Sequence, residues 1–210
     1  MRHTLAGAGG VRDRFQGSIA GVGFTSGFRA VIGCWDASPF GAFSDVMLQY
    51  PGRDGERVLI APTQQVGDYV TATYSFDRVL IEGVTVTRVP SGWALTSDTL
   101  ALRCGFGRRT WVGHALAPVP DRLLTAPAFC AAVDPIARQL VPGVRTAGQA
   151  RPGRWEFYGA VDQRVVTDAT ATLSGRSLGR LAPVSPACTF GFSSTPRRPV
   201  VTRLVTTVVR

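Results

Sequence analysis

The chain has 210 residues, of which 45% are hydrophobic and 18% are charged, and its formal net charge at pH 7 is +9. This composition is too apolar for intrinsic disorder, while no uninterrupted apolar run approaches the ~18 residues that a membrane-spanning helix needs. The N-terminal residues lack the apolar segment of a secretory signal, so we expect one cytoplasmic domain without membrane contact.

Residues 1–15 combine a Gly-rich stretch with alternating charges and predict a flexible N-terminal tail, which leaves a single β-barrel-like domain over residues 16–210. Within that domain, short runs rich in Val, Ile, Thr and aromatic residues alternate with Gly and Pro, a pattern typical of strands. The predicted strands cover residues 17–24, 27–36, 43–50, 56–61, 78–89, 92–96, 99–106, 153–166, 169–174, 187–193 and 199–209.

The segment PTQQVGDYVTAT predicts a short helix near residues 63–74. Thr63 can cap its N-terminus, because a threonine hydroxyl can accept a hydrogen bond from a free N–H of the first turn. Three apolar residues after it follow the i, i+3, i+4 spacing of one helix face.

The Ala- and Leu-rich segment 118–142 predicts a helical insertion. Pro127 and Pro135 each lie just after a residue that can cap a helix, Thr125 and Asp134, and a proline inside a helix removes a hydrogen bond. We therefore expect several short helices here rather than one continuous helix.

These elements predict the fold class α+β, mostly β, with a curved or closed antiparallel-rich barrel-like sheet that carries a short helix and a helical insertion. The Gly- and Pro-rich stretches 142–154 and 193–199 are predicted to be loops between strands.

All 23 basic residues are arginines, because the chain contains no lysine. The absence of lysine and asparagine, whose codons are AT-rich, indicates a GC-rich genome and favours a bacterial source. It also excludes catalysis through a lysine Schiff base. The arginines are scattered, with doublets only at Arg108–Arg109 and Arg197–Arg198, which favours a solvated basic surface over a nucleic-acid site.

The sequence indicates no metal and no cofactor. Its four cysteines, Cys34, Cys104, Cys130 and Cys188, lie too far apart to form a zinc-binding pair and are expected to be buried free thiols. No Gly-rich nucleotide-binding motif is present, and His114 is the one histidine beyond the predicted tail, so no catalytic triad is indicated.

The segment RWEFYGAVD shows the clearest alternation of side chains in the chain. Glu156, Tyr158, Ala160 and Asp162 share one face of this predicted strand. In an open sheet this face would contact solvent, whereas in a barrel it could present two carboxylates and a phenol to a ligand cavity. The sequence leaves both alternatives open.

Two arginines lie on otherwise apolar predicted strands. Arg203 lies in the run 199–209, and Arg29 shares a face with Gly33 and Trp35. A buried guanidinium needs a carboxylate partner or an anionic ligand, although a long side chain can also reach solvent. Gly33 would leave room on its face for a ligand or a neighbouring backbone.

The stretch SPFGAFSDVMLQYPG, residues 38–52, places Phe40, Phe43 and Asp45 at the start of an apolar predicted strand. It is followed by RVLIAP, TQQVGDYVTAT and RVLIEGVTV. In this order the segments resemble the acetoacetate decarboxylase superfamily, whose members carry S-P-x-G-P-Y-x-E-hydrophobic before a strand, a short helical element and a return strand. The resemblance covers residues 30–90 and implies a barrel-like mixed sheet around a small cavity, with Asp45 near the family's acidic position.

The chain departs from that family at the catalytic residue. The family's decarboxylases use a lysine Schiff base within a G-R-E...P-K-K segment, which is absent here together with every other lysine. Decarboxylation by this route is therefore excluded even if the fold is shared. A calycin-type, lipocalin-like barrel is the rival interpretation, although no G-x-W motif opens the first predicted strand.

Charged residues on apolar strands predict a β-barrel that binds a small, partly apolar molecule, which could be anionic. The candidate ligand contacts are Arg29, Trp35, Asp45, Glu156, Tyr158 and Arg203. The alternative is a cofactor-free hydratase, cyclase or isomerase in which a carboxylate, Glu156 or Asp45, carries a proton. A third hypothesis is an interaction module that uses the arginine doublets. The sequence does not indicate an oligomeric state.

Overall fold

The computed structural model describes residues 10–210; residues 1–9, which hold most of the predicted tail, lie outside this part. The strands of the described part are β1 (Arg12–Phe24), β2 (Arg29–Ala37), β3 (Phe43–Gln49), β4 (Arg57–Ala61), β5 (Arg78–Ile81), β6 (Thr85–Val89), β7 (Gly92–Thr96), β8 (Leu100–Arg109), β9 (Ala147–Arg151), β10 (Arg154–Leu173), β11 (Arg176–Ala182) and β12 (Val200–Val209). Its helices are α1 (Gln64–Thr71), α2 (Trp111–Leu116), α3 (Asp121–Leu124) and α4 (Pro127–Leu140).

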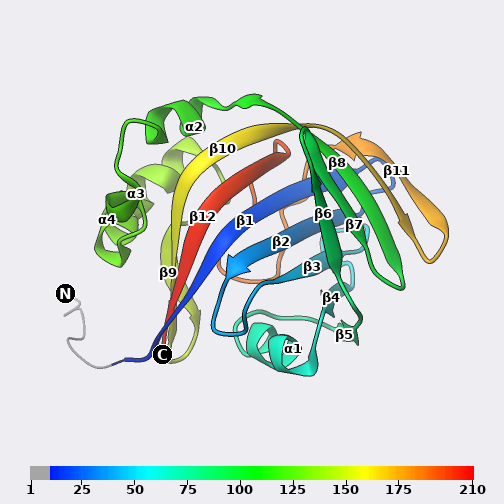
Figure 1. Ribbon diagram of the computed structural model, residues 1–210, viewed down its shortest axis with the longest axis horizontal. Coiled ribbons are helices and arrows are strands. Elements are labelled where there is room, and N and C mark those ends of the chain that lie inside the picture. Colours follow the sequence, from blue (N-terminus) through cyan, green and yellow to red (C-terminus); the bar gives the residue numbers. More distant parts are fainter. Residues whose placement is uncertain (1–9) are drawn as a thin grey trace.

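All of these strands belong to one strongly curved sheet (Figure 1). The strands follow the order β5-β4-β3-β2-β1-β11-β10-β8-β7-β6, with β12 between β1 and β10 and with β9 on β10. Every pair is antiparallel except β4 and β5, which are parallel and connected through α1. Within residues 10–210 the outermost strands β5 and β6 do not pair, so the sheet is ring-like without closing into a barrel. The predicted α+β, mostly β fold class is confirmed.

The two longest strands, β1 and β10, change partner along their length. β1 pairs with β12 up to Gly21 and with β11 from Gly23, while β10 pairs with β12 up to Val165 and with β11 from Thr170. The sheet therefore folds over itself, and its inner face forms the main core. Buried members of this core include Ala20, Val22, Ile32, Val46, Leu48, Ile60, Leu95, Leu102 and Val166.

Helix α1 covers the opposite, outer face of the sheet beside β4 and β5 (Figure 1). The hydroxyl of Thr63 accepts a hydrogen bond from the backbone N–H of Val66, so the predicted helix and its cap are confirmed. Val66 and Val70 pack on Leu59 and Ala61 of β4. This helix, together with the outer face of β1–β3, encloses the candidate site described below.

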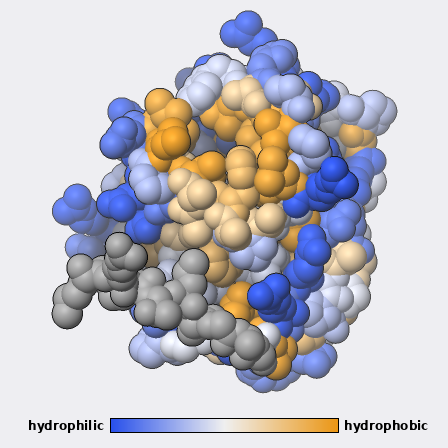
Figure 2. All heavy atoms as spheres, turned by 90° about the vertical axis from the view of Figure 1, so that its left-hand side faces the viewer, coloured by the Kyte–Doolittle hydropathy of each residue, from blue (hydrophilic) through white to orange (hydrophobic). Residues whose placement is uncertain are grey.

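Helices α2, α3 and α4 lie along β10, away from α1 (Figure 1). Gly159 of β10 permits this close packing, because a Cβ there would lie 2.5 Å from the Cα of Thr125. Apolar side chains gather on this side of the molecule (Figure 2), and the exposed large apolar residues of α3 and α4 are Leu123, Ile136 and Leu140. Within residues 10–210, no helix is long and apolar enough to cross a membrane.

The predicted helical insertion near residues 118–142 is confirmed, but the helix break predicted at Pro135 is wrong. α4 continues through Pro135 to Leu140. Asp134 does not cap a helix; its carboxylate instead forms an ion pair with Arg145 and accepts hydrogen bonds from the backbone of the strand region that follows. These tertiary contacts offset the hydrogen bond that a proline removes.

Several predicted strand limits also differ from the structure. Residues 12–15 belong to β1 rather than to a tail, because they pair with the last residues of β12. Residues 78–89 form two strands, β5 and β6, whereas 153–166 and 169–174 form the single strand β10. Residues 187–193 form a loop and not a strand. Cys188 and Phe190 of this loop pack with Val184 in a small hydrophobic cluster.

Strands β9 and β11 lie outside the predicted strands, and β9 lies in a predicted loop. Their sequences, AGQAR and RSLGRLA, lack the β-branched and aromatic residues that predict a strand. β9 pairs with β10 at the edge of the sheet, and β11 pairs with both β1 and β10. Their conformation is therefore determined by neighbours distant in the sequence.

Candidate functional site

A cavity of about 60 Å³ lies between α1 and the outer face of the sheet. Its wall combines apolar side chains with two carboxyl groups, contributed by β1, β2, β3, α1, the turn after α1, β10 and β12. The lining residues are Phe15, Ile19, Trp35, Phe43, Asp45, Met47, Tyr69, Val70, Thr73, Tyr74, Glu156, Thr206 and Val208. Because one enclosed water needs about 10–15 Å³, this cavity can hold a ligand of about four to six non-hydrogen atoms.

Glu156 of β10 is 1% exposed and forms the polar centre of the cavity. The hydroxyl of Tyr74 lies 2.9 Å from Oε1, the hydroxyl of Tyr158 lies 2.9 Å from Oε2, and the two hydroxyls lie 2.8 Å apart. Burial raises the pKa of Glu156 to about 7, although the hydrogen bonds from both tyrosines and the charge of Arg154 act in the opposite direction. Burial and the Glu156 carboxylate also raise the pKa of each tyrosine well above its usual range.

The number of protons in this triangle indicates the protonation state of Glu156. Three short O···O contacts join the groups, but two phenols carry only two protons. A third hydrogen bond requires a proton on the carboxyl group, which then donates to one tyrosine while accepting from the other. A neutral Glu156 therefore gives a closed ring of three hydrogen bonds, in agreement with its raised pKa.

Asp45 of β3 is the second carboxyl group of the cavity and is 3% exposed. Its Oδ1 accepts a hydrogen bond from Nε1 of Trp35 at 3.0 Å. A Cβ at Gly33 would lie 2.3 Å from this oxygen and 2.7 Å from that nitrogen, so the room predicted beside Gly33 is filled by the Asp45–Trp35 pair. Burial raises the pKa of Asp45 to about 6, while the hydrogen bond from Trp35 lowers it.

Aromatic rings form much of the remaining wall. The ring of Phe15 lies 5.7 Å from that of Trp35, 6.4 Å from that of Phe43 and 5.3 Å from that of Tyr69, measured between centroids. Thr206 also lines the cavity, and its buried hydroxyl has no hydrogen-bond partner among residues 10–210. Buried hydroxyls are rarely unpaired, which makes this one unusual.

The structure brings three of the six predicted contacts, Trp35, Asp45 and Glu156, to this one cavity. Tyr158 lies beside them and is connected to the cavity through its hydrogen bond to Glu156. Residues far apart in the sequence thus converge here because their strands are neighbours on the outer face of the sheet.

The sequence left open whether the polar face of β10 points into a cavity or toward solvent, and different residues of this face behave differently. Glu156 points into the cavity, as a ligand site would require. Asp162 does not, because the register shifts between Ala160 and Asp162, and its carboxylate pairs instead with Arg109 at 2.7 Å.

Arg29 does not line the cavity, although it is fully buried. Its guanidinium donates hydrogen bonds to the backbone oxygens of Tyr50 at 2.7 Å, Gly52 at 2.6 Å and Pro186 at 3.1 Å. The expectation of a carboxylate partner or an anionic ligand is thus corrected, because three carbonyl oxygens solvate the charge. Arg29 joins the turn after β3 to the long loop before β12.

Arg203 lies on the surface, where its guanidinium is 3.3 Å from the Asp121 carboxylate of α3. Its long side chain reaches solvent, which is the second of the two alternatives considered for it. The expectation of an anionic ligand depended on Arg29 and Arg203, and neither of them lines the cavity.

The sequence did not single out Phe15, Tyr74 or Thr206 as site residues. Phe15 lay at the boundary of the predicted tail, and Tyr74 lies at the end of the predicted short helix. Thr206 is one of several threonines in the last strand, and nothing in that pattern distinguishes it. The contact between Tyr74 and Glu156 joins residues 82 positions apart, which no local periodicity can reveal.

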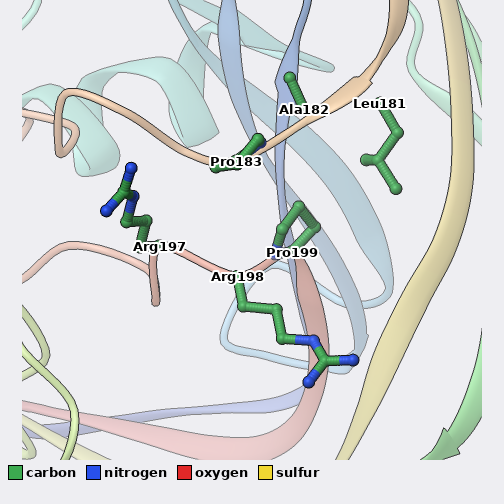
Figure 3. A pocket seen from close by; sticks show the side chains of 6 residues that line it. All are labelled: Leu181, Ala182, Pro183, Arg197, Arg198 and Pro199. Carbon is green, nitrogen blue, oxygen red and sulfur yellow. The ribbon is translucent and has the colours of Figure 1, made fainter.

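A second hollow, of about 460 Å³, lies on the surface between the end of β11 and the segment before β12. It is lined by Leu181, Ala182, Pro183, Arg197, Arg198 and Pro199. Figure 3 shows that the two guanidinium groups point in different directions, so they do not converge on one anion. This hollow is open and lacks buried polar groups, so the arginine doublet does not form a defined binding site.

Metal-binding and thiol chemistry have little support in the described part of the chain. Residues 10–210 contain no group of three or more His, Cys, Asp and Glu side chains placed to hold a metal ion. The four cysteines are buried free thiols, as predicted. Burial raises the pKa of Cys104 to about 12 and the pKa values of Cys130 and Cys188 to about 11, which disfavours reactive thiolates.

Comparison with known proteins gives a distant likeness to a solved structure. No protein-family model and no curated protein matches the chain. Among solved structures, the chain is similar to the acetoacetate decarboxylase from Legionella pneumophila subsp. pneumophila str. Philadelphia 1, with a TM-score of 0.43 and 9% sequence identity over 99% of this chain and 90% of that chain. So distant a likeness concerns the fold alone, and the superfamily resemblance seen in residues 30–90 stays a prediction.

Replacement of Arg29 by methionine is expected to lower the free energy of unfolding by about 3 kcal/mol or more, because it leaves three buried carbonyl oxygens without a donor. The matched control Arg203→Met should change it by less than about 1 kcal/mol, because that ion pair is exposed. Urea denaturation measures both values. Equal losses for the two variants would contradict the structural role assigned to Arg29.

The stability of the protein is expected to fall as the pH rises from 5 to 8. Both acids have folded-state pKa values, about 6 for Asp45 and about 7 for Glu156, above their values in unfolded chains. The contribution of these two acids to the free energy of unfolding is fully present below about pH 4 and is lost as the pH rises through 6 and 7. The loss amounts to a few kcal/mol at most. Urea denaturation across this range measures the slope.

The variants Glu156→Gln and Asp45→Asn should each flatten this slope, since each removes one titrating group. Asp77→Asn is the control, because the hydrogen bonds and charge of Arg57 hold the pKa of Asp77 at about 2, outside the range tested. A slope that survives in the double variant Asp45→Asn/Glu156→Gln would show that other groups cause it.

Proposed function

We propose that this protein binds a small, partly apolar molecule in the cavity between α1 and the sheet. The observation that supports this most strongly is that buried, hydrogen-bonding groups from distant segments, Asp45, Glu156 and Thr206, line one aromatic-walled cavity. Ligand sites are typically apolar cavities with a few placed polar groups. The volume is below the ~300 Å³ of drug-sized pockets, so the ligand is a small metabolite or fragment of about four to six non-hydrogen atoms.

A thermal-shift screen of neutral, cationic and anionic compounds of this size tests the proposal. At least one compound should raise the unfolding midpoint of the wild-type protein, because a ligand that binds the native state stabilises it. The variant Ile19→Phe, which fills the cavity, should lose that shift. The control Ile136→Phe places the same substitution on the exposed surface of α4 and should keep it.

Mass spectrometry of the protein under native conditions adds an unbiased search for a co-purified ligand. Near-UV circular dichroism establishes that Ile19→Phe is folded before its binding is compared. The proposal fails if no compound shifts the midpoint, or if every shift is the same in Ile19→Phe as in the wild type.

Proton transfer is the second candidate function, and the hydrogen-bonded ring around Glu156 favours it. A carboxyl group with a pKa near 7 can give and take a proton at physiological pH. Tyr74 and Tyr158 hold the carboxyl group in place and can relay its proton between the two carboxyl oxygens. Such a group could remove a proton next to a carbonyl, which is the first step of many isomerase reactions.

Exchange of the methyl hydrogens of acetone in D₂O, followed by proton NMR, tests this second function. The protein should accelerate exchange, and Glu156→Gln should reduce the acceleration by about 100-fold or more. Asp162→Asn, on the same strand but outside the cavity, should leave the rate unchanged. Tyr74→Phe should shift the pH profile by removing one hydrogen bond of the ring. Exchange that is equal in Glu156→Gln and wild type would exclude this role.

A further inference from the structure

We propose that the ligand of this cavity is a small amine bound as its ammonium cation. This inference rests on the proposed binding function and narrows it to one chemical class. Three independent properties of the cavity support it: the sign of its ionisable groups, the aromatic composition of its wall and its unpaired hydroxyl.

The carboxyl groups of the cavity are not neutralised by ion pairs. Within residues 10–210, no arginine lines the cavity and no salt bridge includes Asp45 or Glu156. The guanidinium of Arg154 lies nearby, but it stacks 5.0 Å from the Tyr69 ring centroid and donates to the hydroxyl of Thr73. A buried carboxylate is costly without a cation, and the protein supplies one to Glu156 only through the charge of Arg154, without a salt bridge. A cationic ligand in the cavity would therefore gain a stronger attraction.

The wall of the cavity suits an ammonium group and its alkyl chain. Phe15, Trp35, Phe43, Tyr69 and Tyr74 all line it. The faces of aromatic rings attract cations, and indole does so most strongly. The same rings offer apolar contact to the methylene groups of an alkylamine. An anionic ligand would meet the two carboxyl groups and is therefore disfavoured.

The hydroxyl of Thr206 favours an ammonium ion that carries N–H donors over a cation whose nitrogen is fully alkylated. Thr206 lines the cavity, and its buried hydroxyl has no hydrogen-bond partner in residues 10–210. Its oxygen can accept an N–H hydrogen bond, as can the oxygens of Asp45 and Glu156. An ionised Glu156 also leaves its tyrosine ring one proton short, and an N–H donor from the ligand can replace that hydrogen bond.

A comparison of nearly isosteric ligands tests the charge directly on the wild-type, full-length protein. n-Butylamine, 1-butanol and butyrate have about the size of the cavity and differ in charge. Ligand-observed NMR titrations at pH 8 should give butylammonium a dissociation constant at least tenfold lower than that of 1-butanol, with no measurable binding of butyrate. The inference is overturned if 1-butanol or butyrate binds as tightly as butylammonium, although the proposed binding function would then stand. If none of the three binds and the screen also gives no hit, both proposals fail.

Variants assign the effect to the cavity. Asp45→Asn and Glu156→Gln should each weaken butylammonium at least tenfold while changing 1-butanol less than threefold. Thr206→Val should weaken butylammonium several-fold, and the control Asp162→Asn should leave it within twofold. Butylammonium affinity that is unchanged in both carboxyl variants would overturn the inference. The comparison of ligands on the wild type decides the question if a carboxyl variant does not fold.

Discussion

The change of partner along β1 and β10 is the constraint on which the rest of the structure depends. Each strand is long enough to hydrogen-bond two different neighbours in succession, so the sheet has to fold over where the partners diverge. The inner face then supplies the main hydrophobic core. The outer face of the same strands stays free for α1 and for polar side chains. The main core and the candidate site are therefore placed on opposite faces of one sheet, and a carboxyl group on β10 can be buried without entering that core.

The ionisable side chains of Asp45 and Glu156 make the cavity acidic in composition, although the molecule carries a net positive charge. The chain carries a formal net charge of +9, yet neither carboxyl group of the site belongs to a salt bridge within residues 10–210. The arginines that the sequence suggested as ligand contacts serve other purposes. Arg29 is solvated by backbone carbonyls and fastens two loops together, and Arg203 pairs with Asp121 at the surface. The proton needed to close the ring of Glu156, Tyr74 and Tyr158 explains how a buried acid is held without a cation.

Local patterns in the sequence predicted the parts of the fold and of the site that depend on neighbouring residues. The cap at Thr63 and the alternation around Glu156 are of this kind; the cap is correct, and the alternation holds as far as the register shift between Ala160 and Asp162. Strand β11 and the continuation of α4 through Pro135 were missed, because distant partners determine them. The same limit applies to the site. Asp45 and Glu156 were recognised as carboxyl groups at unusual positions, but the tyrosine that joins Glu156 from 82 residues away could not be recognised.

Helix α1 connects the parallel strands β4 and β5 at the edge of the sheet, and it contributes to the cavity without carrying either carboxyl group. Tyr69 and Val70 lie on this eight-residue helix, while Thr73 and Tyr74 follow directly after it. The two helix residues shape the cavity, whereas Tyr74 also donates a hydrogen bond to Glu156. Substitutions at Tyr69 and Val70 would change the shape of the cavity, while Glu156 would keep its hydrogen bonds to Tyr74 and Tyr158. The fold therefore offers a simple route by which new specificities can evolve.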